Sequence, residues 1–219
     1  MPVARRFPAS FLKKYPLSIE VILVNTLFFS FLMGFSVSGL MAQSEALNRA
    51  ERFKQHHDWR APLGVPLLLS GNFGELRGNH FHTGVDLKTK GKEGLPVLAA
   101  TEGRVSRIKM SPWGYGNALY LEGPDDVLTV YAHLQAFVPD IQEWAVNQTY
   151  KGRTLGMDAA PSGQDAFWVE AGDTLGWSGN SGGSGGPHLH FEIWREYLPL
   201  DPFIFFPEYL SSDLTLDNE

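Results

Sequence analysis

The chain has 219 residues, which predicts one domain with appendages, and its lack of cysteine excludes disulfide frameworks and thiolate metal sites. Hydrophobic residues make up 43% and charged residues 19%, with 23 glycines and 14 prolines, which is typical of a turn-rich β protein. The net charge of −6 argues against a nucleic-acid partner, because such proteins need a basic surface.

The N-terminus carries the pattern of an export signal. Four basic residues at positions 5, 6, 13 and 14 precede an apolar run from Val21 to Ala42 that ends in small residues. We therefore expect residues 1–42 to be a signal peptide. The alternative is an uncleaved membrane anchor, because residues 21–42 are long enough to span a bilayer. Either form predicts an exported protein of the periplasm or cell envelope.

Residues 43–65 are expected to form a helical lead-in. Ser44 can cap a helix in which Leu47, Ala50 and Phe53 follow helical spacing. From residue 66 to residue 206 the pattern changes to short apolar runs separated by glycine and asparagine, such as "TGVDLK", "GNALYLEG", "VLTVYAHL" and "HLHFEIW". Strands at this spacing predict a mainly β domain, a sandwich or barrel.

One segment interrupts the strands. Residues 139–165 are expected to be an insertion, with a helix that begins at Pro139 and a polar, glycine-rich loop after it. An excursion of this kind either borders a site or is a solvated decoration. Residues 207–219 form an acidic tail.

The histidines and one aspartate predict a metal site. His82 and Asp86 would be about 13 Å apart in an extended strand, so a shared ion requires a bend, which Gly84 permits. Gly84 also has no side chain to occupy the space of the ion. His188 and His190 lie two apart on a predicted strand, so both face one side and Leu189 faces the core. Either histidine can supply a third ligand. Two histidines and a carboxylate leave the fourth position of a tetrahedral zinc open for water, as in catalytic sites.

The motifs resemble those of the lysostaphin/LytM-type zinc metallopeptidases over about residues 67–202. The matching blocks are "FGELRGNHFHTGVDL", "GYGNALYLEG", "YAHL" and "GDTLGWSGNSGGSGGPHLHFE". The resemblance implies an antiparallel β-sheet groove of the duplicated hybrid motif type, to which this chain adds a short N-terminal helix and one helical insertion. It implies Zn²⁺ held by His82, Asp86 and His190, with His133 and His188 as catalytic residues. It also implies hydrolysis of peptide bonds in peptidoglycan cross-links and stems.

Four further residues are candidates for substrate binding. Tyr131 lies two residues before His133, on the same face of the predicted strand, and is expected either to line the cleft or to pack in the core. Asn117 is expected to hold a turn or orient a ligand. Asn180 is expected either to offer hydrogen bonds to an extended peptide or to belong to a plain glycine-rich turn. Arg77 is expected to contact the substrate or Asp86, and the alternative is a plain surface charge. The chain has no His-Glu-x-x-His motif, so the free imidazoles would carry the protons in catalysis.

Two rival functions remain at this point. The first is a non-catalytic regulator that uses the same groove to bind another cell-wall hydrolase. The second is a lipoyl- or biotin-carrier module, but no lysine with a fitting motif lies at a hairpin tip, and five histidines would be unexplained. The predicted partners are peptidoglycan peptides, with membrane anchoring through residues 21–42 as the alternative to cleavage. The sequence predicts no oligomeric state.

Overall fold

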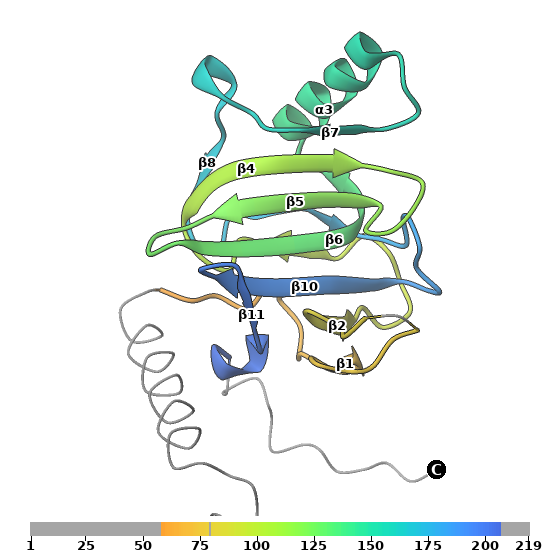
Figure 1. The fold of residues 1–219 in the computed structure, drawn as a ribbon, viewed down its shortest axis with the longest axis vertical. Helices are drawn as coiled ribbons and strands as arrows, with labels where there is room; N and C mark the ends of the chain where they lie inside the picture. The colour runs from red at the N-terminus through yellow and green to blue at the C-terminus, as the bar shows by residue number, and fades with distance from the viewer. Residues whose placement is uncertain (1–57, 79, 207–219) are drawn as a thin grey trace, which may run out of the picture. The chain divides into compact units, whose positions relative to one another are not determined.

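The computed structural model describes residues 58–206, apart from residue 79, and the regular structure in this part of the chain is mostly antiparallel strands (Figure 1). The elements in chain order are β1 (Leu69–Gly71), β2 (Val85–Lys88), β3 (Pro96–Leu98), β4 (Gly103–Met110), β5 (Asn117–Glu122), β6 (Val127–Phe137), α3 (Pro139–Gly152), β7 (Met157–Ala159), β8 (Trp168–Val169), β9 (Thr174–Ser178), β10 (His188–Arg195) and β11 (Leu198–Leu200). The mainly β fold expected from the sequence is confirmed.

The sheet has the strand order β1-β2-β10-β6-β5-β4-β7. Every strand pairing among the described residues is antiparallel. The pair β2 and β10 joins segments that lie about a hundred residues apart in the chain. Strand β9 pairs with both β3 and β6, and β11 pairs with the far end of β10. Strand β10 therefore lies between β2 and β6, and side chains from these three strands meet on one face.

The two faces of β10 have different chemistry. Leu189, Phe191 and Ile193 are completely buried on the core face, where Phe191 packs against Tyr131 with ring centroids 5.3 Å apart. The prediction that Leu189 faces the core is confirmed. The opposite face carries His188 and His190, because neighbouring side chains in a strand alternate between faces.

A small apolar cluster covers the opposite face next to the histidines. Its buried members come from β5 and β6, and partly buried aromatic and leucine side chains pack around it; the buried members are Ala118, Tyr120, Val130 and Ala132, and the surrounding ones are Tyr115, Leu128 and Trp194. The cluster forms an apolar surface beside the polar side chains of β10. The guanidinium of Arg107, in β4, lies 4.8 Å from the ring centre of Tyr120 at the edge of this cluster.

The described part of the expected helical lead-in, residues 58–65, is not helical. Leu63 forms a bridge with Val97 and is buried, and Ala61 is buried close by. Pro62 and Gly64 disfavour a helix here, so the segment runs along the sheet instead. The expected signal or anchor over residues 1–42, the helix from Ser44 and the acidic tail all lie outside the described residues. Within residues 58–206, no helix is long and apolar enough to cross a membrane.

The helical insertion expected after Pro139 is present as α3, with Pro139 in its first turn and Arg153 closing it in the left-handed conformation. Ile141 and Ala145 bury one side of the helix. The following segment is more ordered than the expected polar loop, because β7 pairs with β4. Helix α3 contacts β4, β6 and β7, so it packs toward the sheet edge opposite β2 (Figure 1).

Substitution of Gly84 tests whether the close approach of this segment to β10 stabilises the fold. A Cβ at this position would overlap the carbonyl oxygen of Phe191 and lie 2.7 Å from Cγ of Glu192. We expect Gly84→Ala to lower the free energy of unfolding by about 1–3 kcal/mol, because the strands cannot separate without losing their pairing. Gly64→Ala is the matched control, since a Cβ there meets nothing within 4 Å. Urea denaturation of both variants measures the difference, and equal stabilities would contradict this reading.

Candidate metal centre and its neighbouring histidines

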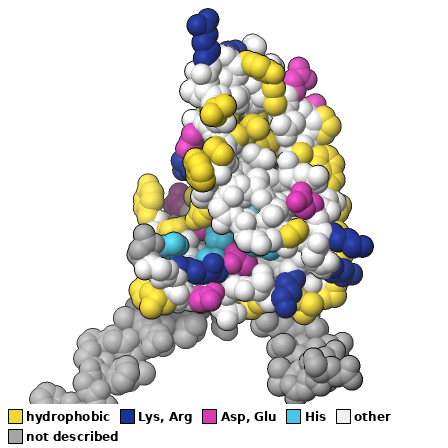
Figure 2. Space-filling model, turned by 90° about the vertical axis from the view of Figure 1, so that its right-hand side faces the viewer, with side chains coloured by type: hydrophobic (Ala, Val, Ile, Leu, Met, Phe, Trp, Pro, Cys, Tyr) yellow, Lys and Arg dark blue, Asp and Glu magenta, His cyan; other side chains and the backbone are white. Residues whose placement is uncertain are grey.

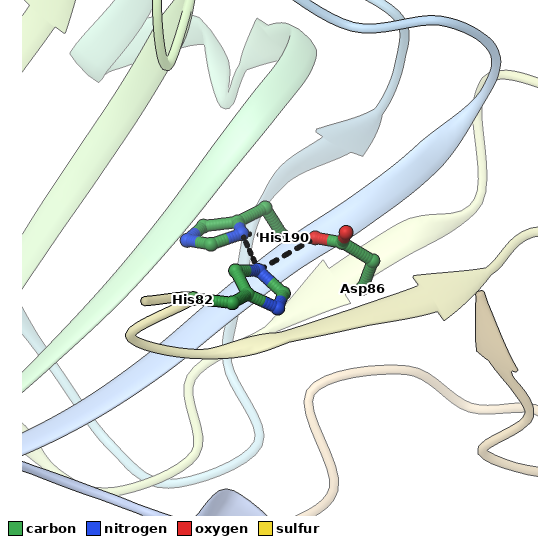
Figure 3. Close-up of side chains that lie close together, drawn as sticks. All are labelled: His82, Asp86 and His190. Carbon is green, nitrogen blue, oxygen red and sulfur yellow. Dashed lines mark hydrogen bonds and ion pairs between the residues drawn. The ribbon is translucent and has the colours of Figure 1, made fainter. Parts of the chain in front are cut away.

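Three buried side chains converge on one point between β2 and β10 (Figure 3). Nε2 of His82 lies 3.0 Å from Nδ1 of His190 and 3.2 Å from Oδ1 of Asp86. Nδ1 of His190 lies 2.9 Å from the same Asp86 oxygen. The three side chains are the ones that the family resemblance implied as metal ligands.

The pairing of β2 with β10 brings two of these residues together. Asp86 stands directly opposite His190 in the antiparallel register, so both side chains leave the sheet on the same face. His82 precedes β2 and reaches the same point because the chain bends at Gly84, as expected. Gly84 is also expected to leave space for the ion. The structure gives another reason for the missing side chain, which is the close approach of Gly84 to Phe191 and Glu192.

In His82 and His190, the nitrogen that faces away from the cluster (the outer nitrogen) determines whether the nitrogen that faces the cluster (the inner nitrogen) carries a hydrogen or a lone pair. Nδ1 of His82 lies 2.8 Å from the carbonyl oxygen of Asn72, which can only accept, so this nitrogen carries the hydrogen. Nε2 of His190 lies 2.8 Å from a carboxylate oxygen of Glu192 and donates in the same way. Two lone pairs and one carboxylate oxygen therefore face one another. Tetrahedral zinc, with ligands at about 2.0–2.2 Å, fits such a set of donors.

The charges around the cluster also favour a cation. Burial alone would raise the pKa of Asp86, but contacts with basic side chains outweigh it and hold that pKa far below its ordinary value; these side chains are His188, His190, His82 and Arg77. Burial alone would lower the pKa of His190, but its bonds to Asp86 and Glu192 raise it instead. The Asp86 carboxylate thus stays ionised and attracts positive charge.

Arg77 contacts Asp86, one of the two roles expected for it. Its Nη2 donates to Oδ2 of Asp86 at 2.7 Å and to Glu75 at 3.2 Å. The guanidinium therefore fixes the carboxylate oxygen that does not face the histidines. Gly71 leaves room for this pair, because a Cβ there would overlap both Asp86 and Arg77. A role of Arg77 in binding substrate stays a prediction.

His133 and His188 lie beside the cluster with their rings 4.7 Å apart. Each donates from Nδ1 to a backbone carbonyl at 2.8 Å, His133 to Ser181 and His188 to Gly186. These bonds leave Nε2 of both rings available. Nε2 of His188 lies 3.5 Å from Oδ1 of Asp86. Histidine side chains gather in a hollow of the surface, with acidic and basic side chains beside them (Figure 2).

A β-bulge turns His133 toward this group. Between the pairs Leu119↔Tyr131 and Asn117↔Leu134, β6 has one residue more than β5, and His133 has a φ of 59°. The prediction that Tyr131 and His133 share one strand face is wrong, because the bulge breaks the alternation. Tyr131 is fully buried, and its hydroxyl accepts a hydrogen bond from the backbone of Ala100. Tyr131 therefore belongs to the core and not to the cleft wall.

His133 is neutral at pH 7 in this setting. Burial is the largest influence and lowers its pKa to about 4, although its bond to the Ser181 carbonyl opposes that shift. A neutral imidazole with an unprotonated Nε2 can accept a proton from a reacting group. Its neighbour His188 is half-buried. The pair can therefore serve as proton-transfer groups.

The remaining sequence candidates divide into a structural residue and an exposed one. Asn117 donates from its side chain to the carbonyls of Leu134 and Gln135, while its backbone N–H bonds to the Ser181 hydroxyl. It therefore holds the bulge and the Ser181 loop in place, as the turn-holding alternative expected. Asn180 is exposed, and its contact with substrate stays a prediction.

Glu192 is a site residue that the sequence argument missed. Its carboxylate accepts hydrogen bonds from His190, Thr83, Tyr115 and Trp194, and it is buried. Burial would raise its pKa, but these bonds, led by that from His190, lower it to about 2. The strand alternation could have identified it, because residues 188, 190 and 192 lie on the same face and the Glu192 carboxylate is therefore beside the two histidines.

Comparison with known proteins agrees with the motifs. Residues 80–157 match the sequence model of Peptidase family M23, which confirms the family resemblance. The chain is 31% identical over 121 residues to "DD-carboxypeptidase/endopeptidase Mpg" of Neisseria meningitidis, covering 55% of this chain and 22% of that protein. It is 26% identical over 150 residues to "Murein hydrolase activator NlpD" of Salmonella typhimurium, covering 68% and 32%. The chain thus spans about a fifth to a third of these curated relatives.

A solved structure supports the fold. Lysostaphin from Staphylococcus simulans superposes with a TM-score of 0.52 at 24% identity, covering 74% of this chain and 59% of that one. This similarity supports the arrangement of the strands and leaves the chemistry to be argued from the residues themselves.

Metal content tests the three-residue cluster. We expect the purified protein to bind about one divalent cation per chain, measured by inductively coupled plasma mass spectrometry, because three ligands converge on one point. Asp86→Ala should lose the cation, since it removes the only carboxylate of the set. A chelator should lower the melting temperature of the wild type and leave that of Asp86→Ala unchanged, because only a bound ion stabilises the fold by mass action. A variant that kept its metal would contradict the assignment.

Glu192 should tune this centre through His190. Glu192→Gln removes the charge that orients Nε2 of His190, so we expect metal affinity to fall by about 10- to 100-fold in competition with a chelating dye. Glu122→Gln is the matched control, because Glu122 pairs with Arg104 at the far end of the sheet. Equal affinities for the two variants would show that Glu192 does not support the metal.

Proposed function

We propose that this chain, whose residues 80–157 carry a peptidase family M23 domain, is a zinc-dependent endopeptidase that hydrolyses peptide bonds of peptidoglycan. The observation that carries the proposal is the arrangement of two unbound histidines beside a three-residue metal centre. A purely structural zinc site is closed by four protein ligands. Three ligands with free imidazoles alongside describe a hydrolytic site.

Zinc is the cofactor that suits these donors. His82, Asp86 and His190 would hold it, and when bound it lowers the pKa of a water molecule toward about 7 and polarises a carbonyl. Asn72 and Glu192 keep the hydrogens of the two imidazoles on their outer nitrogens. Arg77 keeps Asp86 ionised and correctly turned. These contacts orient the three side chains that would hold the metal.

His133 and His188 would divide the two remaining tasks. One accepts the proton of the attacking water at Nε2 and returns a proton to the leaving amine. The other donates a hydrogen bond from Nε2 to the oxyanion that develops on the substrate carbonyl. The carbonyls of Ser181 and Gly186 bind Nδ1 of the two rings and so leave Nε2 of each ring as the nitrogen that can act on substrate. The neutral state of His133 at pH 7 suits it to accept a proton.

The cell wall is the proposed place of action. The relative from Neisseria meningitidis is named a carboxypeptidase and endopeptidase, and the basic and apolar N-terminal residues of this chain are typical of exported proteins. Peptidoglycan stem and cross-link peptides are the substrates that fit both observations. Export through a cleaved signal or retention through residues 21–42 both bring the domain to the envelope.

A regulator of another hydrolase is the second candidate, because one relative is named a murein hydrolase activator. The complete set of three metal donors and two oriented histidines favours catalysis, since a domain that only binds a partner does not need proton-transfer groups. The two functions differ in turnover. An enzyme releases soluble fragments from purified peptidoglycan by itself, whereas an activator does so only with its partner hydrolase present.

Substitution of the free histidines separates metal binding from catalysis. We expect His133→Ala and His188→Ala to keep about one zinc per chain and to lose at least about 100-fold in the rate of peptidoglycan hydrolysis. Release of soluble muropeptides, followed by mass spectrometry, measures the rate and identifies the bond that is cut.

His80→Ala is the matched control for these variants. His80 lies in the segment just before the metal ligands but is exposed and outside the three-residue cluster. It should keep both zinc and activity. Full activity in His133→Ala would refute the proposed roles, and a zinc-loaded wild type without any hydrolysis would favour the activator.

A further inference from the structure

Lys88 lies on the same face of the sheet as the proposed catalytic residues. It is the last residue of β2 and stands opposite His188 in β10, two positions beyond the pair of Asp86 and His190. Residues directly opposite one another in an antiparallel pair project to the same side. The ammonium group therefore extends from the strand next to the metal centre, on the side of His188.

A single cleft connects this lysine with the centre. Asp86, His188, Lys88 and Lys90 all line it, together with Gly185 and Gly186. A Cβ added at either glycine would meet nothing within 4 Å, so this wall is open. The cleft has room for the part of a substrate that extends beyond a bond held at the metal.

Lys90 is held over the same cleft by a tight turn. Lys90 and Gly91 have φ values of 56° and 68°, and the backbone N–H of Lys92 bonds to the carbonyl of Thr89. Glycine or asparagine occupies such a left-handed position with less strain than lysine. The turn therefore carries a lysine where its backbone favours another residue type.

Neither ammonium group is neutralised within residues 58–206. The ion pairs of this part of the chain include no lysine. Asp86, the carboxylate in the cleft, is already bound by Arg77 at 2.7 Å and by the imidazoles around it. Two positive charges thus line the cleft in a protein whose net charge is −6.

The cleft at the opposite end of β10 carries charges of both signs. It is lined by Glu122, Asp126 and Glu196, beside Trp194, and Arg104 pairs with Glu122 at 2.7 Å. The two lysines of the first cleft therefore offer the better site for an anionic group of a bound peptide.

We propose that Lys88 and Lys90 bind a carboxylate of the substrate, a role that rests on the proposed peptidase function. The substrate class is then an acidic stem peptide with a free carboxylate close to the scissile bond, and not a neutral bridge of glycine residues. The lysines are specificity-determining residues, because they contact a part of the substrate that does not react. They act by holding the peptide in the cleft beside His188.

A pair of substrates that differ only in charge tests this role. Soluble cross-linked muropeptides are used with their carboxylates free, and after conversion of those carboxylates to carboxamides. For the full-length wild type we expect kcat/KM to be at least about tenfold higher on the free-acid form, because two charge-assisted contacts are lost on amidation. The double variant Lys88→Gln, Lys90→Gln should reduce this preference to within about twofold.

Lys92→Gln is the matched control, since Lys92 is an exposed lysine two residues farther along that does not line the cleft. It should keep the tenfold preference. The preference of the wild type should also fall as salt is raised, because salt screens exposed charges. An unchanged preference in the double variant, with hydrolysis intact, would overturn the role of the lysines and leave the peptidase function standing.

Binding of the same two peptides decides the role of the lysines if hydrolysis is not observed. Fluorescence anisotropy with labelled free-acid and amidated muropeptides gives the dissociation constants for the wild type and the double variant. The wild type should bind the free-acid form at least about tenfold more tightly, and the double variant should bind both forms equally. Absence of hydrolysis with this binding difference would refute the peptidase function alone. Equal binding of both peptides by the wild type would refute the carboxylate site.

Discussion

The pairing of β2 with β10 is the constraint on which the site depends. In the observed register Asp86 faces His190 and Lys88 faces His188, so a carboxylate, two imidazoles and an ammonium group share one face. A slip of one residue would turn each of these side chains of β2 toward the core and would put Leu87 among the histidines. The register is fixed by the other face, where Leu87, Leu189 and Phe191 are completely or almost completely buried. Packing of the core thus determines the geometry of the polar site.

The observed register brings three hydrogen-bond acceptors together on the polar face of the sheet. Two imidazole nitrogens and a carboxylate oxygen meet within 3.2 Å, and the outer hydrogen bonds to Asn72 and Glu192 leave only lone pairs between them. A group of acceptors with no donor is unfavourable when buried, and a cation relieves it. The same charges explain why an arginine is needed behind Asp86. Without an opposite charge, the second carboxylate oxygen would be desolvated with no partner.

Much of this site could be predicted from the sequence, because alternation along strands and the bend at Gly84 are local properties. The pairing of His82 with Asp86, and the core position of Leu189, needed no knowledge of distant contacts. The errors arise where the backbone departs from the regular pattern. The bulge at His133 separates it from Tyr131, and no residue type in "VYAHL" signals an extra residue. Helix α3 was predicted, but its packing toward the far sheet edge depends on the strand order, which the sequence does not show.

The most direct test of the account is a crystal structure of the zinc-loaded protein with diffraction data collected above and below the zinc absorption edge. The account predicts one anomalous peak per chain, about 2.0–2.2 Å from Nε2 of His82, Oδ1 of Asp86 and Nδ1 of His190, with water completing the coordination. His133 and His188 should lie close to that water without binding the ion. A peak bound by His133 or His188 in place of these ligands, or no peak at saturating zinc, would contradict it.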